Sequence, residues 1–154
     1  MTDLFNGCAA LTTVNLSSFN TARVTNMKNL FNGCAALTTL DLSSFNTAQV
    51  TNMKNLFNGC VGMKNLYLNN FNVSNADIEN MVKNMADNAS LSNLCTVYCP
   101  VGVESKILEN NNGTYYSGLD EGTGGNYSDR RVYDNNIGGW RTGKSIVFTR
   151  PPSK

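Results

Sequence analysis

Nearly perfect internal repetition constrains this chain more than any other feature. Residues 4–29 read LFNGCAALTTVNLSSFNTARVTNMKN, and residues 30–55 read LFNGCAALTTLDLSSFNTAQVTNMKN, so the two stretches differ at only three positions. A third copy begins at Leu56. A repeat of this length is one small structural unit that cannot bury its apolar face alone, so successive units must stack and share one core.

Each unit contains two different apolar periodicities. The segment LTTLDLSSF (37–45) has the leucine spacing of a short strand with one buried face, and VTNMKNLF (50–57) has the spacing of one face of a helix. Thr51 can cap that helix, and Gly59 can end it in a left-handed conformation. A leucine-rich repeat contains one strand and one helix in about 20–29 residues, and the length of this repeat falls within that range. The predicted fold is therefore α/β: a leucine-rich repeat solenoid of 26-residue repeats, with one short strand and one short helix in each.

The third unit follows the pattern at first and then drifts. Its second half matches best after a slip of two residues, which aligns Met53 with Met81. The same slip aligns Leu66 with Leu94, so LSNLCTVYC (91–99) is predicted to form a fourth repeat.

The repeat is lost in the C-terminal part of the chain. VGVESKILEN (101–110) predicts a short helix, and SIVFT (145–149) predicts a strand that two prolines end. Because the last repeat of a stack needs a cover, residues 91–154 are predicted to be the last repeat and an irregular C-terminal cap. Residues 1–90 are then the solenoid domain.

The combined phrase of the repeat resembles a known family. F-x-G-C, then L-T-x-L-D-L-S-S-F-N-T, then V-T-N-M are similar to the BspA-like leucine-rich repeat of bacterial and protist surface proteins, closely over residues 4–73 and loosely to residue 99. The resemblance implies a non-enzymatic module of a bacterial adhesin-like surface protein, which binds a protein or glycan of a host or neighbouring cell. Similar modules occur in phage tail proteins, so a structural or receptor-binding part of a tail fibre is the alternative.

Composition narrows the classes of function further. The net charge is +1, which predicts no nucleic-acid partner, and no apolar run is long enough to predict membrane insertion. The chain has no histidine, which excludes Ser-His-Asp catalysis and removes the commonest metal ligand, so we expect no enzyme activity, cofactor or metal. The first residues lack the features of a signal peptide, so a cell-surface or extracellular location requires a longer secreted chain. Homo-oligomers through the terminal repeat or the cap are left open.

One motif points in a different direction. Residues 138–145, GGWRTGKS, match the phosphate-binding loop, in which Gly138 and Gly143 would shape the turn, Lys144 would reach the phosphates and Ser145 would hold Mg²⁺. Such a loop must open a helix. Here a β-branched and aromatic stretch follows, so we interpret the motif as a Gly-rich turn, and a nucleotide-binding enzyme is the remote alternative.

A candidate binding surface follows from the strands. Side chains alternate along a strand, so the residues between the inward leucines face away from the core, on the concave surface of the solenoid. Most are small and polar, but Tyr67 has the kind of ring that anchors interfaces. The predicted binding residues are Thr13, Asn15, Ser17, Thr39, Asp41, Ser43, Asn65, Tyr67 and Asn69. A solvated face without a ligand is the alternative.

Three further columns recur at the repeat period. Because stacked thiols point the same way and a disulfide needs facing Cβ vectors, one column is predicted to be buried and reduced: Cys8, Cys34 and Cys60. The aromatic column is predicted to lie in the core: Phe19, Phe45 and Phe71. The amide column after it is predicted to bond to backbone in the turn that leaves the strand: Asn20, Asn46 and Asn72.

Overall fold

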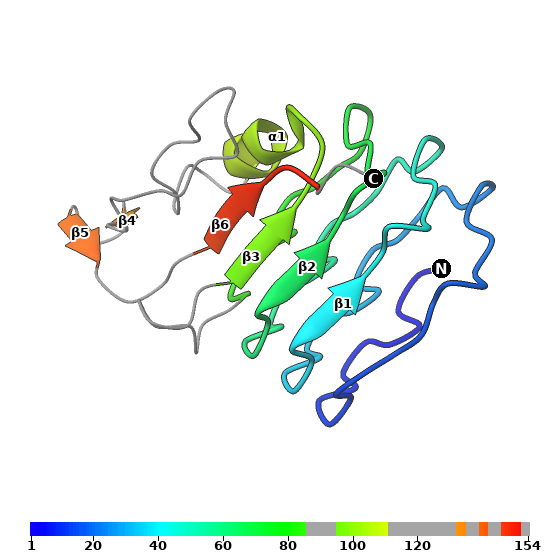
Figure 1. The fold of residues 1–154 in the computed structure, drawn as a ribbon, viewed down its shortest axis with the longest axis horizontal. Helices are drawn as coiled ribbons and strands as arrows, with labels where there is room; N and C mark the ends of the chain where they lie inside the picture. Colours follow the sequence, from blue (N-terminus) through cyan, green and yellow to red (C-terminus); the bar gives the residue numbers. More distant parts are fainter. Residues whose placement is uncertain (86–94, 111–131, 135–138, 142–145, 152–154) are drawn as a thin grey trace.

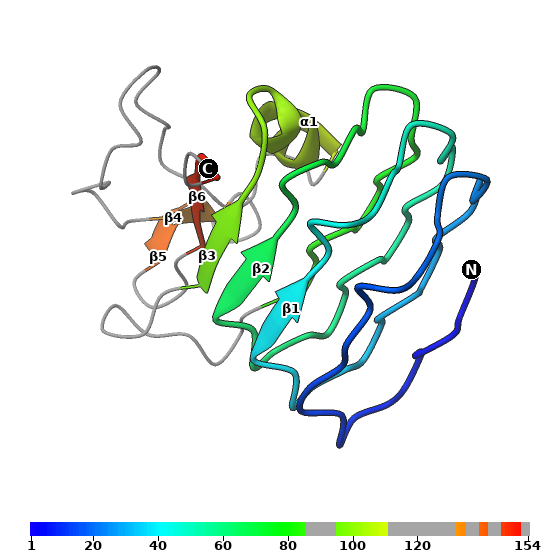
Figure 2. The same ribbon diagram turned by 45° about the vertical axis from the view of Figure 1, so that its right-hand side comes forward.

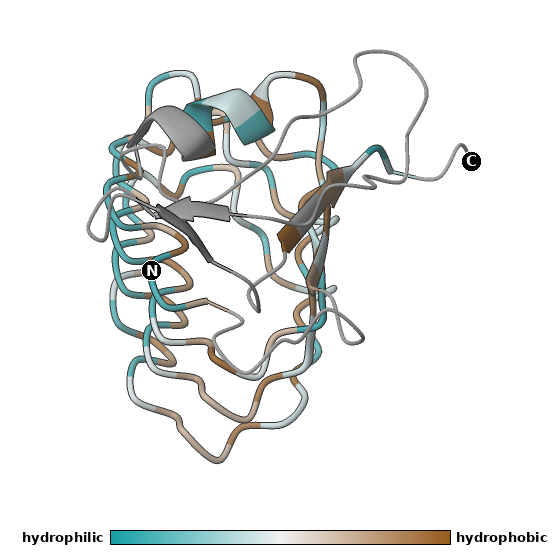
Figure 3. Ribbon diagram, turned by 90° about the vertical axis from the view of Figure 1, so that its left-hand side faces the viewer, coloured by the Kyte–Doolittle hydropathy of each residue, from teal (hydrophilic) through white to brown (hydrophobic). Residues whose placement is uncertain are grey.

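The 26-residue units stack side by side. The computed structural model describes residues 1–85, 95–110, 132–134, 139–141 and 146–151 of the 154-residue chain. Figure 3, which looks along the stack, shows successive turns of the chain superposed on one another. Each unit therefore runs through the strand side of the stack and returns through the opposite side.

A parallel sheet forms one side of the stack (Figure 1). Its strand order is β1 (Thr39–Asp41), β2 (Asn65–Tyr67), β3 (Cys95–Tyr98) and β6 (Ile146–Thr149). Parallel pairing joins every neighbouring pair in this sheet. The strands predicted within the second and third repeats and near residues 145–149 are confirmed.

The remaining elements belong to the C-terminal part. A helix, α1 (Val103–Asn110), follows β3 and confirms the helix predicted over residues 101–110. A separate antiparallel pair consists of β4 (Val132–Asp134) and β5 (Gly139–Arg141). Figures 1 and 2 place α1 at the carboxyl ends of the strands, beside the stack. The predicted boundary near residue 90 lies outside the described residues and stays a prediction.

The core lies between the two sides of the stack. Alternation along the strands turns Leu40 and Leu66 inward, where 1% and 0% of their surfaces are exposed. From the opposite side, the rings of Phe5, Phe31 and Phe57 stack in a column with centroids 5.3 and 6.2 Å apart. The second and third units contribute buried side chains at matching positions, and the first unit adds partly buried ones, so one core runs through the units.

The predicted helix in each repeat is wrong, and with it the predicted leucine-rich repeat solenoid of alternating strands and helices. The segment VTNMKNLF forms consecutive turns, and α1 is the one α-helix among the described residues. Asn29 and Asn55 have φ of 56° and 57°, in the left-handed region, which interrupts any right-handed helix. Gly59 is left-handed as expected, with φ of 75°, but it belongs to this run of turns. Thr51 caps no helix, because its hydroxyl donates to the Thr25 carbonyl of the preceding unit.

The backbone hydrogen bonds explain why turns replace the helix. The N–H groups of Asn29 and Phe31 donate to carbonyls of the next unit, those of Lys54 and Leu56, at 3.0 and 3.1 Å. Between them, the N–H of Leu30 closes a short turn within its own unit. Alternate amides thus bond between units, which satisfies the backbone and fastens the units together.

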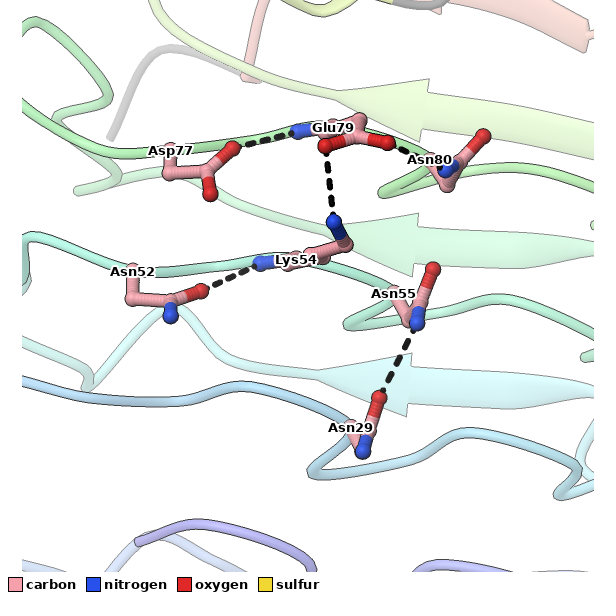
Figure 4. A network of polar contacts seen from close by, with 7 residues as sticks. All are labelled: Asn29, Asn52, Lys54, Asn55, Asp77, Glu79 and Asn80. Carbon is pink, nitrogen blue, oxygen red and sulfur yellow. Dashed lines mark hydrogen bonds and ion pairs between the residues drawn. The ribbon is translucent and has the colours of Figure 1, made fainter.

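Asparagine side chains add a second set of bonds between units (Figure 4). The side-chain amide of Asn29 donates to Asp3 Oδ1 at 2.9 Å, and that of Asn55 donates to Asn29 Oδ1 at 3.2 Å. We call these three residues the asparagine ladder. The backbone of Asp3 is also left-handed, with φ of 59°, a conformation that Asn and Asp tolerate better than most residues. The amides predicted to bond to backbone do so, since the Oδ1 atoms of Asn20, Asn46 and Asn72 accept from N–H groups two residues further on.

The predicted alignment of the third repeat is wrong. The Met27 N–H donates to the Asn52 carbonyl, and the equivalent Met53 N–H donates to the Asp77 carbonyl. Met53 therefore corresponds to Ile78 rather than to Met81. The third unit is one residue shorter than the second on this side, whereas the prediction made it two residues longer.

The register of the strand in the fourth repeat also differs from the prediction. This strand is β3, but Leu66 pairs with Val97 of β3, and Leu94, the predicted partner position, lies outside the described residues. The connection between the third and fourth strands is therefore longer than the repeat pattern implied.

The first unit exposes residues that later units bury. Phe19 is 36% exposed, whereas Phe45 and Phe71 are 0% and 3% exposed. Cys8 is exposed, whereas Cys34 and Cys60 are buried as predicted. The predictions of burial for Phe19 and Cys8 are wrong because, among the described residues, no other unit lies against the outer side of the first.

An ion pair fastens α1 to the end of the sheet. Arg150, which follows β6, donates to Glu104 Oε1 at 2.6 Å, and Glu104 is only 6% exposed. Burial alone would raise the pKa of Glu104, but Arg150 and nearby backbone N–H groups together lower it. β3, α1 and β6 thus share one end of the core.

Candidate functional site

The register of the sheet places outward side chains in two rows. One row contains Thr39, Asn65 and Thr96. The other contains Asp41, Tyr67 and Tyr98, and we call it the tyrosine row. No described element lies over the outward face of β1, β2 and β3 in Figures 1 and 2. Both rows are therefore presented at the surface.

A stacked pair of aromatic rings dominates the tyrosine row. The ring centroids of Tyr67 and Tyr98 are 4.5 Å apart, and the ring planes are within 3° of parallel. This spacing is close to the separation of neighbouring strands, about 4.8 Å, so the sheet itself holds the rings face to face. Burial, and then the neighbouring Tyr98 and Asp41, raise the pKa of Tyr67. Tyr67 was expected to be exposed, but it is half-buried by its neighbour.

Asp41 stands beside this pair with one oxygen already engaged. Its Oδ1 accepts the backbone N–H of Ser43 at 2.8 Å, and the residue is exposed. In the first unit, Asn15 makes the same bond to the N–H of Ser17 at 3.0 Å. The turn therefore needs a side-chain oxygen at this position but not a charge, and the Asp41 carboxylate retains a second oxygen for other contacts.

The predicted site residues of the first unit lie outside the strands of the sheet. Thr13, Asn15 and Ser17 are exposed and belong to no strand. The sequence pattern predicted that they form the same binding surface as the equivalent residues of the second and third units. The structure brings the later units together and leaves these three residues at the end of the stack.

The remaining predicted residues border the rows. Ser43 and Asn69 follow the strands, and both are half-buried. The Ser43 carbonyl accepts from the side chain of Asn70, which ties the turns of two units together. Asn69 Oδ1 is buried and has no hydrogen-bond partner. Ser43 and Asn69 therefore belong to the turns beside the rows and are less accessible to a partner than exposed residues.

Two residues of the rows were not among the predicted binding residues. Thr96 and Tyr98 were predicted to lie in the fourth repeat but not on the binding surface. The alternation C-T-V-Y in β3, with Cys95 and Val97 buried, is the signal that identifies the other two as outward-facing.

The four buried cysteines are unsuited to nucleophilic chemistry. All five are free, and the pKa of Cys34 is raised to about 11, chiefly by burial. Burial also raises the pKa values of Cys60, Cys95 and Cys99 to about 12. Each of these four thiols is protonated at neutral pH, and the thiolate is the reactive form.

The phosphate-loop motif is only partly described. Gly138 and residues 142–145, including Lys144 and Ser145, lie outside the described residues. Within the motif, residues 139–141 form the antiparallel strand β5, and the strand β6 begins directly after it. A phosphate loop opens a helix, so a strand in that place disfavours nucleotide binding.

In the described ranges, no three metal-ligating side chains of Cys, Asp or Glu are grouped so as to hold an ion. No helix among the same residues is long and apolar enough to cross a membrane.

The stack and its tyrosine row define a repeat protein with a surface-presented polar and aromatic face. The chain belongs to the family described as Mycoplasma protein of unknown function, DUF285, whose model matches residues 1–94. Neither the curated proteins nor the solved structures contain a match to the chain. The family match covers the repeat region and supports no more specific assignment to a BspA-like leucine-rich repeat.

Proposed function

We propose that this chain is a non-enzymatic interaction module whose outward sheet face binds a partner macromolecule. The observation that supports this most is the stacked pair of Tyr67 and Tyr98 on a parallel sheet whose outward face no described element covers. Parallel sheets usually have both faces covered by other elements. Tyrosines are enriched where partners bind, because a rigid ring buries a large area and its hydroxyl remains polar.

The regularity of the repeats supports binding over catalysis. A catalytic site needs unlike groups that converge on one point, whereas the first two units present nearly the same side chains in parallel. The protonated thiols of the four buried cysteines agree with this proposal.

The proposed setting is the surface of a bacterial cell. Support comes from the resemblance of the repeat phrase to BspA-like surface repeats. The partner would be a protein or glycan of a host or neighbouring cell, and the tyrosine row would be at the centre of the contact.

The test is adherence of protein-coated beads to cultured host cells and to bacterial cells. Tyr67→Ala should weaken binding by at least about 1 kcal/mol, roughly fivefold in affinity, as expected for an aromatic anchor. It should cost only about 1 kcal/mol of stability, because the ring is half-buried and loses one stacking contact. Protease or glycosidase treatment of the cells separates protein from glycan partners.

Lys54→Ala is the matched control, because Lys54 lies on the opposite side of the stack in an exposed ion pair with Glu79. It should leave adherence unchanged. Equal binding by the Tyr67→Ala variant and the original protein would refute the proposal, as would an equal loss in both variants.

A further inference from the structure

The tyrosine row ends in a step. Tyr98 and Tyr67 stack at the strand spacing, and the next position in the same register is Asp41 on β1. An aspartate side chain is much shorter than a tyrosine. The ring face of Tyr67 that points away from Tyr98 therefore rises above the Asp41 carboxylate.

We infer that this step binds a guanidinium group, with the Asp41 carboxylate as its floor and the Tyr67 ring as its wall. The inference rests on the proposed function and specifies its partner as a protein that presents an arginine side chain. The guanidinium would continue the stack of Tyr98 and Tyr67 as a third planar layer above β1.

The geometry of the row fits a planar cation. A cation interacts favourably with a tyrosine ring when it lies within about 6 Å of the ring centroid, and neighbouring strands are about 4.8 Å apart. A group placed above Asp41 is thus at stacking distance from Tyr67. The spacing of 4.5 Å between the two tyrosine rings shows that planar groups pack well at this separation.

The charge of the step selects a cation. Asp41 is the charged residue in the two rows formed by β1, β2 and β3, and its second carboxylate oxygen is not used by the turn to Ser43. Arginine suits this site better than lysine, because its planar guanidinium can stack on a ring and donate to a carboxylate at the same time.

The chain offers its own control for removing the charge. Asn15 occupies the position of Asp41 in the first unit and accepts the same backbone N–H. Asp41→Asn should therefore preserve the turn and remove only the charge. Asp77→Asn is the matched control, since Asp77 is also exposed, its Oδ1 also accepts an N–H two residues on, and it lies on the opposite side of the stack.

The experiment is a selection of random twelve-residue displayed peptides on the full chain, with counter-selection on the Asp41→Asn variant. Selected peptides should be enriched in arginine over lysine. Replacing that arginine with the neutral isostere citrulline should weaken binding at least about fivefold to the original chain and to the Asp77→Asn variant. The same replacement should change binding to the Asp41→Asn variant by less than about twofold.

Three outcomes would overturn the inference: no peptides selected, peptides without arginine, or equal citrulline effects on the original chain and the Asp41→Asn variant. Bead adherence separates this failure from failure of the proposed function. If Tyr67→Ala abolishes adherence and Asp41→Asn does not, the face is a binding surface but the guanidinium site is wrong.

Discussion

The left-handed backbone of the asparagine ladder predicts that a glycine variant is more stable than an alanine variant. Asn55 has φ of 57°, and its side-chain amide donates to Asn29 Oδ1 at 3.2 Å. Asn55→Gly and Asn55→Ala both remove this hydrogen bond, which costs about 1 kcal/mol. Alanine also pays the steric cost of the left-handed region, about 1–2 kcal/mol, whereas glycine does not.

The expected order of stability is therefore Asn55, then Asn55→Gly, then Asn55→Ala. The glycine variant should lose about 1.5–2 kcal/mol, which includes the entropy of a freer unfolded chain, and the alanine variant about 2–3 kcal/mol. Urea unfolding followed by circular dichroism measures both midpoints. A helix at this position predicts the opposite order, because alanine is more stable than glycine by about 1 kcal/mol in a helix interior.

Asn58 provides the matched control three residues further on. It is half-buried like Asn55, but its φ is not positive. Asn58→Ala should be at least as stable as Asn58→Gly. If Asn55→Ala is as stable as Asn55→Gly, the ladder does not depend on the left-handed backbone and our explanation of the missing helix fails.

Two further predictions concern the ends and the interior of the stack. Thiol reagents should label Cys8 rapidly and Cys34 only after unfolding, because Cys8 is exposed and Cys34 is buried. The free energy of unfolding should also fall as pH rises from about 9 to 11. The pKa of Cys34 is raised to about 11 in the folded protein, so the thiol ionises first in the unfolded chain. Rapid native labelling of Cys34, or a urea midpoint that is the same at pH 7 and pH 10, would contradict this. Inserting before Leu4 a second copy of residues 4–29, with the cysteine of the inserted copy replaced by alanine, should raise the melting temperature and slow the labelling of the original Cys8, because the added unit covers the exposed end of the first. An unchanged labelling rate of Cys8 would count against stacking in the same register.

The strands were predictable because their pattern has one interpretation. Leucines alternate with small polar residues over a few positions, and the repeat copies that pattern at a fixed spacing, so Leu40 and Leu66 had to be neighbours. The same holds for α1 and for β6, which have ordinary helix and strand patterns.

The turn side was not predictable from apolar spacing alone. Met27, Leu30, Phe31 and Cys34 are all fully buried, and their spacing matches a helix face. In the structure this spacing comes from consecutive short turns, each closed by a backbone bond over three residues. Asparagine at every third position was the distinguishing signal, because asparagine disfavours helix interiors and tolerates the left-handed region.

The site was only partly predictable because its key contact is non-local. Tyr67 was identified from its own unit, but its stacking partner Tyr98 belongs to a strand that the pattern aligned incorrectly. The connection before β3 does not keep the repeat length, so no spacing rule could place Tyr98 beside Tyr67. Hydrogen-bond register in the sheet, which the sequence does not encode locally, decides this contact.

The tyrosine row shows how a repeating scaffold can change its surface without changing its fold. The first two units differ at only three positions, and one of them is Asn15 against Asp41. Both side chains supply the oxygen that the turn requires, so the backbone accepts either, and only the charge presented at the surface changes. The third unit goes further at the same position and places Tyr67 there, while Leu66 and Leu68 remain buried beneath. If this face binds a partner as proposed, selection for that binding can act on this row alone, because the inward leucines and the ladder on the opposite side supply the stability.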